Sequence, residues 1–106
     1  MEYTEIWDLA QDSREDLIAF AQTLVQTPSL SGQEGEAAAL LQSEMTRLGY
    51  DEVWVDEVGN VVGRVAGDGG PPLMFNGHMD HVDAGDLALW PYPPFGGEIY
   101  NGALWG

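Results

Sequence analysis

A short apolar run that ends in a cluster of polar side chains constrains the fold of this chain more than any other feature. The run begins at Leu73 and reaches Gly77, and His78, Asp80 and His81 follow at once. An apolar run of this length is typical of a buried strand. In open α/β sheets, binding and catalytic groups gather just beyond the carboxyl ends of the strands. The sequence therefore predicts a central strand that carries a polar site at its end.

The spacing of His78 and Asp80 predicts that their side chains share a direction. If the backbone stays extended beyond Gly77, residues two positions apart project from the same face. A neutral imidazole nitrogen can ligate zinc, and a neighbouring carboxylate can orient the imidazole and raise its basicity. Short His-x-Asp matches also arise by chance, and a single histidine is often a hydrogen-bonded structural residue. Spacing alone leaves both interpretations open, and His81 falls on the opposite face if the strand continues.

Several separate motifs from about residue 14 to the end occur in the order typical of one enzyme family. They are residues 27–34, 48–50, 58–61 and 77–80, followed by Val82, Gly85, Asp86, Trp90, Pro94, Phe95, Gly97, Glu98, Ile99, Asn101, Gly102, Leu104, Trp105 and Gly106. This series resembles the zinc-dependent acetylornithine deacetylases, succinyl-diaminopimelate desuccinylases, aminoacylases and carboxypeptidases. Within that family, the branch of selenium-metabolism-linked hydrolases is the most similar.

The resemblance implies a role for two residues of the polar cluster. His78 matches the first zinc ligand of the family, and Asp80 matches the catalytic-site aspartate that orients the site without binding metal. At the position of His81 the family usually has a small hydroxyl residue, so the resemblance assigns His81 no role. The segment matched by residues 104–106 leads, in the family, into the motif of the aspartate that bridges two zinc ions. The general-base glutamate and the remaining ligands lie further on.

The resemblance also implies what the chain is part of. Residues 1–106 would form a single domain, the N-terminal part of a metallohydrolase catalytic domain that stops before the bridging-aspartate motif. The full-length enzyme would use two zinc ions to cleave amide bonds of a small-molecule or peptide substrate, such as an N-acyl amino acid. This chain supplies one clear zinc ligand, whereas a catalytic zinc normally has three. We therefore expect weak or absent zinc binding and no activity of the chain on its own.

The periodicity of the sequence predicts an α/β fold class. Two N-terminal helices are expected at 14–26 and 31–48, after a helical turn or two in residues 1–11. The second helix is expected to begin with a capping box formed by Ser31 and Glu34 and to end at Gly49. A β-hairpin at 53–65 precedes the central strand, and Asn101-Gly102 indicates a C-terminal β-hairpin. By resemblance, these elements would form a partial three-layer α/β/α sandwich.

The composition excludes several classes of partner. The chain has 18 acidic residues, three arginines and no lysine, which gives a formal net charge of −15. Such a chain would be repelled by nucleic acid and by anionic membrane surfaces. It has no cysteine and therefore no disulfide or thiolate metal site. No signal peptide and no run of about 20 apolar residues is visible, so a cytoplasmic protein is expected. A chain of this length is expected to bury a modest core.

Two alternatives to the hydrolase interpretation remain open. The chain could be a short non-catalytic module that binds a partner or forms a homodimer through an exposed sheet edge, because the central strand lacks later strands to pair with. It could also bind metal weakly across a dimer, with His78 and His81 contributed by both copies. The loop rich in aromatic residues and proline at 90–95 could form the wall of a substrate pocket, or it could pin its rings against the rest of the chain.

Overall fold

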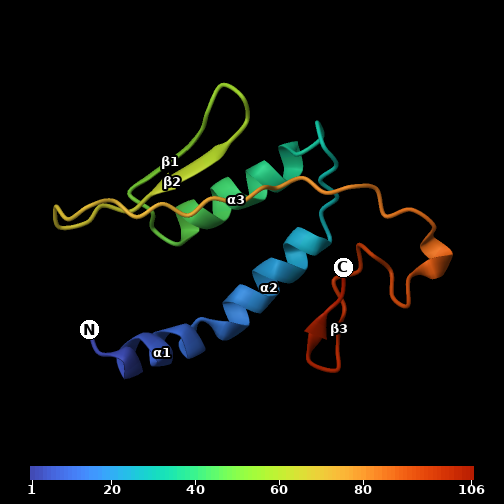
Figure 1. Cartoon of the computed structure of the whole chain (residues 1–106), viewed down its shortest axis with the longest axis horizontal. Helices are drawn as coiled ribbons and strands as arrows, with labels where there is room; N and C mark the ends of the chain where they lie inside the picture. The colour runs from blue at the N-terminus through green and yellow to red at the C-terminus, as the bar shows by residue number, and fades with distance from the viewer. The chain divides into compact units, whose positions relative to one another are not determined.

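Three α-helices and two short antiparallel hairpins make up the regular structure of the computed structural model, which describes residues 1–106 (Figure 1). The predicted α/β class is confirmed. The chain divides into two compact units, one formed by Met1–Thr27 with Ala84–Gly106 and the other by Pro28–Asp83. None of the helices has both the length and the apolar character required to cross a membrane.

Helix α3, Gly35–Arg47, belongs to the second unit and ends just before Gly49, as its sequence predicts. Gly49 has a positive φ of 82°, the left-handed conformation that glycine adopts without steric cost. The backbone N–H of Tyr50 donates to the Met45 carbonyl, and that of Gly49 donates to the Thr46 carbonyl, both at 3.1 Å. These two bonds form a Schellman motif, which satisfies carbonyls at the end of the helix. The predicted role of Gly49 is confirmed.

Strands β1, Glu52–Val55, and β2, Val61–Arg64, form the predicted antiparallel hairpin. The Asp56 carboxylate organises the turn between them, because its Oδ1 accepts the backbone N–H groups of Val58 at 3.0 Å and Asn60 at 2.9 Å. Both strands contact α3, so a helix and a hairpin that are adjacent in the sequence also pack together (Figure 1).

The start of α3 differs from the prediction. The helix begins at Gly35, the N-cap residue Glu34 makes no side-chain cap bond, and the predicted capping box is therefore wrong. Glu34 Oε1 instead accepts the Gly32 backbone N–H at 2.8 Å, and the Ser31 hydroxyl donates to Asp80 Oδ2 at 2.5 Å. Ser31 thus lies three residues before the N-cap residue Glu34, too far back in the chain for a capping box, and its hydroxyl makes a charge-assisted hydrogen bond to the Asp80 carboxylate.

The predicted central strand is an extended segment without a ladder. Residues 71–80 belong to neither sheet, and one parallel bridge between Leu30 and His81 is their nearest regular pairing. Leu73 and Met74 are each 80% exposed and Phe75 is 87% exposed. A strand that is apolar on both faces needs neighbouring strands and covering helices, and the 28–83 unit supplies none for this segment. The regular central strand is thus corrected to an extended segment, and the three-layer arrangement stays a prediction.

The unit formed by the two ends of the chain contains one helix more than predicted. Besides α2, Arg14–Val25, it has α1, Tyr3–Asp12, where only a turn or two was expected. The Glu5 carboxylate accepts the Glu2 backbone N–H at 2.7 Å at the start of α1. This contact satisfies an amide at the helix N-terminus, where a negative charge is also favourable.

The C-terminal part of this unit contains the short helix η1, Leu87–Leu89, and the strands β3, Ile99–Tyr100, and β4, Ala103–Leu104. Asn101 and Gly102 join the two strands with φ values of 52° and 77°, the positive angles that a type I′ turn requires. The predicted C-terminal hairpin is confirmed.

Aromatic rings hold the loop that precedes β3. The Tyr92 ring lies 4.9 Å from that of Trp105 and 5.5 Å from that of Tyr100, measured between centroids. The Trp90 indole N–H donates to the Ala84 carbonyl at 2.9 Å. These contacts support the interpretation in which the loop pins its aromatic side chains against its own unit.

The buried core is smaller than the composition suggests. Ala37, at 4% exposure, is the one buried hydrophobic residue, and Ser29, at 2%, is the one buried polar residue. Small units have too much surface relative to their volume to bury large side chains fully. Many large hydrophobic side chains, such as Phe75, Leu89 and Val82, are therefore exposed.

Candidate functional site

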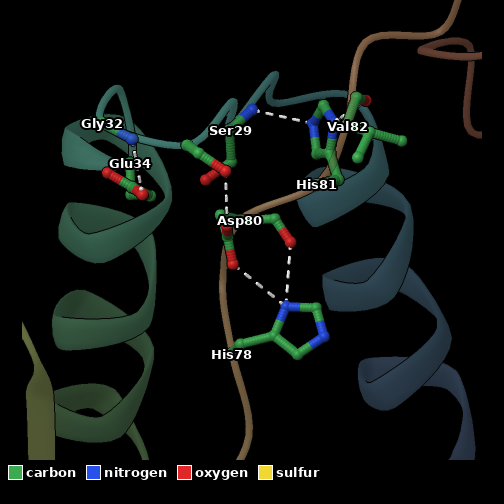
Figure 2. A network of polar contacts seen from close by, with 8 residues as sticks. Ser29, Gly32, Glu34, His78, Asp80, His81 and Val82 are labelled. Atoms are coloured by element: carbon green, nitrogen blue, oxygen red, sulfur yellow. Dashed lines mark hydrogen bonds and ion pairs between the residues drawn. The ribbon is translucent and has the colours of Figure 1, made fainter.

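The candidate site lies where the extended segment meets the stretch that leads into α3. His78 and Asp80 lie at the end of the extended segment, His81 follows it, and Ser29 lies on the other stretch (Figure 2). Ser31 belongs to that other stretch as well. The bridge between Leu30 and His81 holds the two stretches side by side, with the His81 backbone N–H donating to the Ser29 carbonyl at 3.0 Å. The site is thus built from residues about 50 positions apart in the chain.

The structure brings His78 and Asp80 together, as their spacing predicts. His78 Nδ1 lies 2.9 Å from the Asp80 backbone carbonyl oxygen and 3.2 Å from Asp80 Oδ1 (Figure 2). Both neighbours are acceptors, so Nδ1 carries a proton, and Nε2 is the nitrogen whose lone pair is free in the neutral ring. The His78 side chain is 84% exposed. The ring therefore presents an accessible nitrogen ligand whose tautomer is set by a carboxylate on its other side.

The Asp80 carboxylate is held in its ionised form. The Ser31 hydroxyl that donates to Oδ2 is the largest cause that lowers the pKa of Asp80 below its ordinary value. The nearby His78 also lowers this pKa, while partial desolvation opposes the shift. Both oxygens of Asp80 are thus in use, one towards the Ser31 hydroxyl and one towards the His78 ring.

His81 is turned away from this pair by its own hydrogen bonds. Its Nε2 accepts the Ser29 backbone N–H at 2.9 Å, and its Nδ1 lies 2.8 Å from the Val82 carbonyl oxygen. An N–H group faces Nε2 and a carbonyl faces Nδ1, so the ring is neutral with its proton on Nδ1. Because both ring nitrogens are engaged, His81 is not placed to ligate a metal, which weighs against the dimeric metal site.

Sequence reasoning missed two residues of this polar cluster, Ser31, which bonds to Asp80, and Ser29, which bonds to His81. Ser31 was assigned to a helix cap, and Ser29 was given no role. The available signal was that both belong to the 27–34 motif, which resembles the family although it contains no metal ligand. The contacts between this motif and residues 78–81 are long-range in sequence, and spacing along the chain cannot show them.

The residues present fit part of a zinc site. No three side chains of His, Cys, Asp or Glu converge anywhere in the chain in a way that could hold a metal ion. A catalytic zinc needs three protein ligands and an open position. The site therefore fits one imidazole ligand with its orienting carboxylate, and a complete ligand set is not formed by these residues.

Comparison with known proteins identifies succinyl-diaminopimelate desuccinylases among the relatives of this chain. No protein-family model matches the chain, and no solved structure matches it. The succinyl-diaminopimelate desuccinylase of Cereibacter sphaeroides is 43% identical over 94 residues, which is 86% of this chain and 25% of the relative. Enzymes with the same name from Rhodospirillum centenum and Methylorubrum populi are 40% identical over 98 residues and 35% identical over 101 residues.

These matches confirm the resemblance that the motifs predict. They cover 86% and 89% of this chain for the Rhodospirillum and Methylorubrum enzymes, and 25% and 26% of the enzymes themselves. The chain thus spans about a quarter of the length of the curated relatives it matches.

Proposed function

We propose, from the confirmed similarity to succinyl-diaminopimelate desuccinylases, that this chain provides part of the active site of a zinc-dependent hydrolase. The substrate class would be N-acyl amino acids, and an N-succinylated amino acid is the first candidate because the relatives are named for one. The observation that carries the proposal is the contact of His78 Nδ1 with Asp80, which leaves Nε2 accessible.

Each residue of the site has a definite task in this proposal. His78 would ligate one zinc ion through Nε2. Asp80 holds the proton on Nδ1 and makes the ring a better ligand, and Ser31 keeps the Asp80 carboxylate ionised and in place. Zinc, when bound, polarises the substrate carbonyl and lowers the pKa of a bound water to about 7. With one ligand, the chain on its own is expected to bind zinc weakly and to be inactive.

A chimeric enzyme tests this function directly. Residues of this chain would replace the matching quarter of the Cereibacter sphaeroides desuccinylase, and hydrolysis of N-succinyl-diaminopimelate would be followed with and without a zinc chelator. We expect chelator-sensitive activity that is abolished by His78→Ala and falls roughly 10- to 100-fold with Asp80→Ala. Asn76→Ala, on the same extended segment but outside the hydrogen bonds of the site, is the matched control. Equal activity of the His78→Ala chimera and the unchanged chimera would refute the proposal.

A second function is favoured by the exposed extended segment. Leu73, Met74 and Phe75 lie on a stretch of backbone that pairs with no strand, and such a stretch can add to a strand of another molecule. In this alternative the chain is a non-catalytic dimerising module. Sedimentation should then show a dimer that dissociates when Phe75→Asp places a charge in the new sheet. A monomer at all accessible concentrations would contradict it.

A further inference from the structure

Ser29 and His81 form two hydrogen bonds with each other, and the proposed function uses neither of them. The His81 backbone N–H donates to the Ser29 carbonyl at 3.0 Å, and the Ser29 backbone N–H donates to His81 Nε2 at 2.9 Å. In a regular parallel ladder a backbone carbonyl would accept the second of these bonds. Here a side-chain nitrogen serves as that acceptor.

The burial of Ser29 makes loss of the His81 acceptor unfavourable. Ser29 is 2% exposed, so water is poorly placed to satisfy its backbone N–H if the imidazole is removed. The Val82 carbonyl, 2.8 Å from His81 Nδ1, holds the ring proton on the side away from Ser29. The ring therefore presents a lone pair, and not a second N–H, to the Ser29 amide.

The same short stretch carries Ser31 to the candidate metal site. Ser31 lies two residues beyond Ser29, and its hydroxyl donates to Asp80 Oδ2 at 2.5 Å. Asp80 in turn contacts His78 Nδ1 through its backbone carbonyl oxygen at 2.9 Å and through its Oδ1 at 3.2 Å, so the placement of Asp80 affects both acceptors of this nitrogen. A shift of Ser29 would therefore move the stretch of backbone from which Ser31 reaches Asp80.

We propose that His81 is a positioning residue of the His78 site, which acts by accepting the Ser29 amide and so placing Ser31 against Asp80. The importance of this role for zinc binding rests on the proposed function, whereas the hydrogen bond between the Ser29 amide and His81 Nε2 exists without metal or substrate. His81 touches neither a substrate nor a metal in this role. It acts through Ser29, Ser31 and Asp80 on the tautomer of the His78 ring.

The test uses the metal-free 106-residue chain and two matched variants. His81→Gln keeps a side-chain acceptor at about the reach of Nε2, whereas His81→Leu keeps bulk and removes the acceptor. Exchange of the Ser29 amide would be measured by NMR, and two-bond imidazole nitrogen correlations would report the tautomer of His78. With His81→Leu we expect at least about tenfold faster Ser29 exchange and a mixture of His78 tautomers. His81→Gln should retain slow exchange and the Nδ1–H tautomer.

Three results would overturn the proposal. The first is a His78 tautomer that does not change in the Leu variant, which would make His81 a local structural residue. The second is a Gln variant that behaves like the Leu variant, since the acceptor would then not be the cause. If the Leu variant does not fold, His81→Thr replaces it, because the threonine hydroxyl is too short to reach Ser29. The third result is then a His78 tautomer that does not change in the Thr variant.

The results of these NMR experiments do not depend on whether the proposed hydrolase function is correct. The NMR measurements contain no zinc and no substrate, whereas the chimera experiment depends on both. Loss of hydrolysis in the chimera with intact tautomer coupling in the chain would refute the hydrolase and leave the positioning role of His81 in place.

Discussion

The region of α3, β1 and β2 and the extended segment at 71–80 lie in the same unit, yet only the first forms regular paired structure. The hairpin has a complete four-residue register, and both its strands contact α3. The extended segment has a stronger apolar run but no strand beside it. The difference shows that hydrophobicity alone does not make a strand. A strand also needs a partner, which the hairpin finds a few residues away and the extended segment does not find within its unit.

The largest expected contrast between the two regions is in hydrogen exchange. Amides of residues 73–77 should exchange with opening free energies close to 0 kcal/mol, whereas the central amides of α3 should approach the global value. The reason is that no ladder protects the extended segment. Amide exchange followed by NMR or mass spectrometry measures both regions in one sample. Slow exchange across 73–77 would indicate that a partner strand covers the segment in solution.

A methyl group added at Gly63 should destabilise the helix–hairpin region. A Cβ there would lie 2.6 Å from Tyr50 Cδ2 and 2.7 Å from Met45 Sδ, so side chains must move. We expect Gly63→Ala to lower the free energy of unfolding by about 1–3 kcal/mol. Gly77→Ala, on the extended segment, meets nothing within 4 Å and should change it by less than about 0.5 kcal/mol. Urea unfolding compares them, and equal effects would mean that α3 and the hairpin do not pack together in solution.

Substitution of Gly49 should have a smaller effect on the same region. Gly49→Ala forces an L-residue to adopt a φ of 82° at the end of α3 and should cost roughly 1 kcal/mol. Gly35→Ala, at the first residue of α3, has open space around the added methyl and an ordinary φ. It should be neutral or stabilise by a few tenths of a kcal/mol. Thermal unfolding followed by circular dichroism measures the pair, and a neutral Gly49→Ala would disprove the Schellman end.

The smallest expected effect concerns the charge of Asp80 where the extended segment meets the stretch that leads into α3. Ser31→Ala removes the hydroxyl that most lowers the pKa of Asp80, so this pKa should rise towards 3.8. A lowered folded-state pKa adds stability that is present above the unfolded-state value and is lost as pH falls through the folded value. The variant should therefore be slightly less stable than the parent near pH 7, with the difference disappearing in strong acid.

An NMR titration of the Asp80 carboxyl carbon checks this directly, with Ser43→Ala as a control on the exposed surface of α3. An Asp80 titration that is the same in Ser31→Ala and in the parent would show that the hydroxyl does not hold the carboxylate in solution.

The predictions from sequence were most accurate where an element is stabilised by its own neighbours. Gly49, the turn after β1 and Asn101-Gly102 each adopt the predicted conformation because one residue type satisfies one local backbone requirement. Ser31 and Glu34 have the spacing of a capping box, but α3 begins at Gly35 and the Ser31 hydroxyl donates to Asp80, 49 positions away. Local spacing carries no information about a distant acceptor, so the cap was predicted and the site contact was missed.

The sequence by itself determined the end of α3, the hairpin turns and the proximity of His78 to Asp80, because each depends on residues within a few positions of one another. Only the tertiary structure decided that Ser31 donates to Asp80, that His81 accepts from the Ser29 amide, and that the apolar run at 73–75 stays exposed. Those outcomes depend on which groups compete for a donor, an acceptor or a strand partner in space. That competition involves residues far apart in the chain, and a periodic pattern cannot record it.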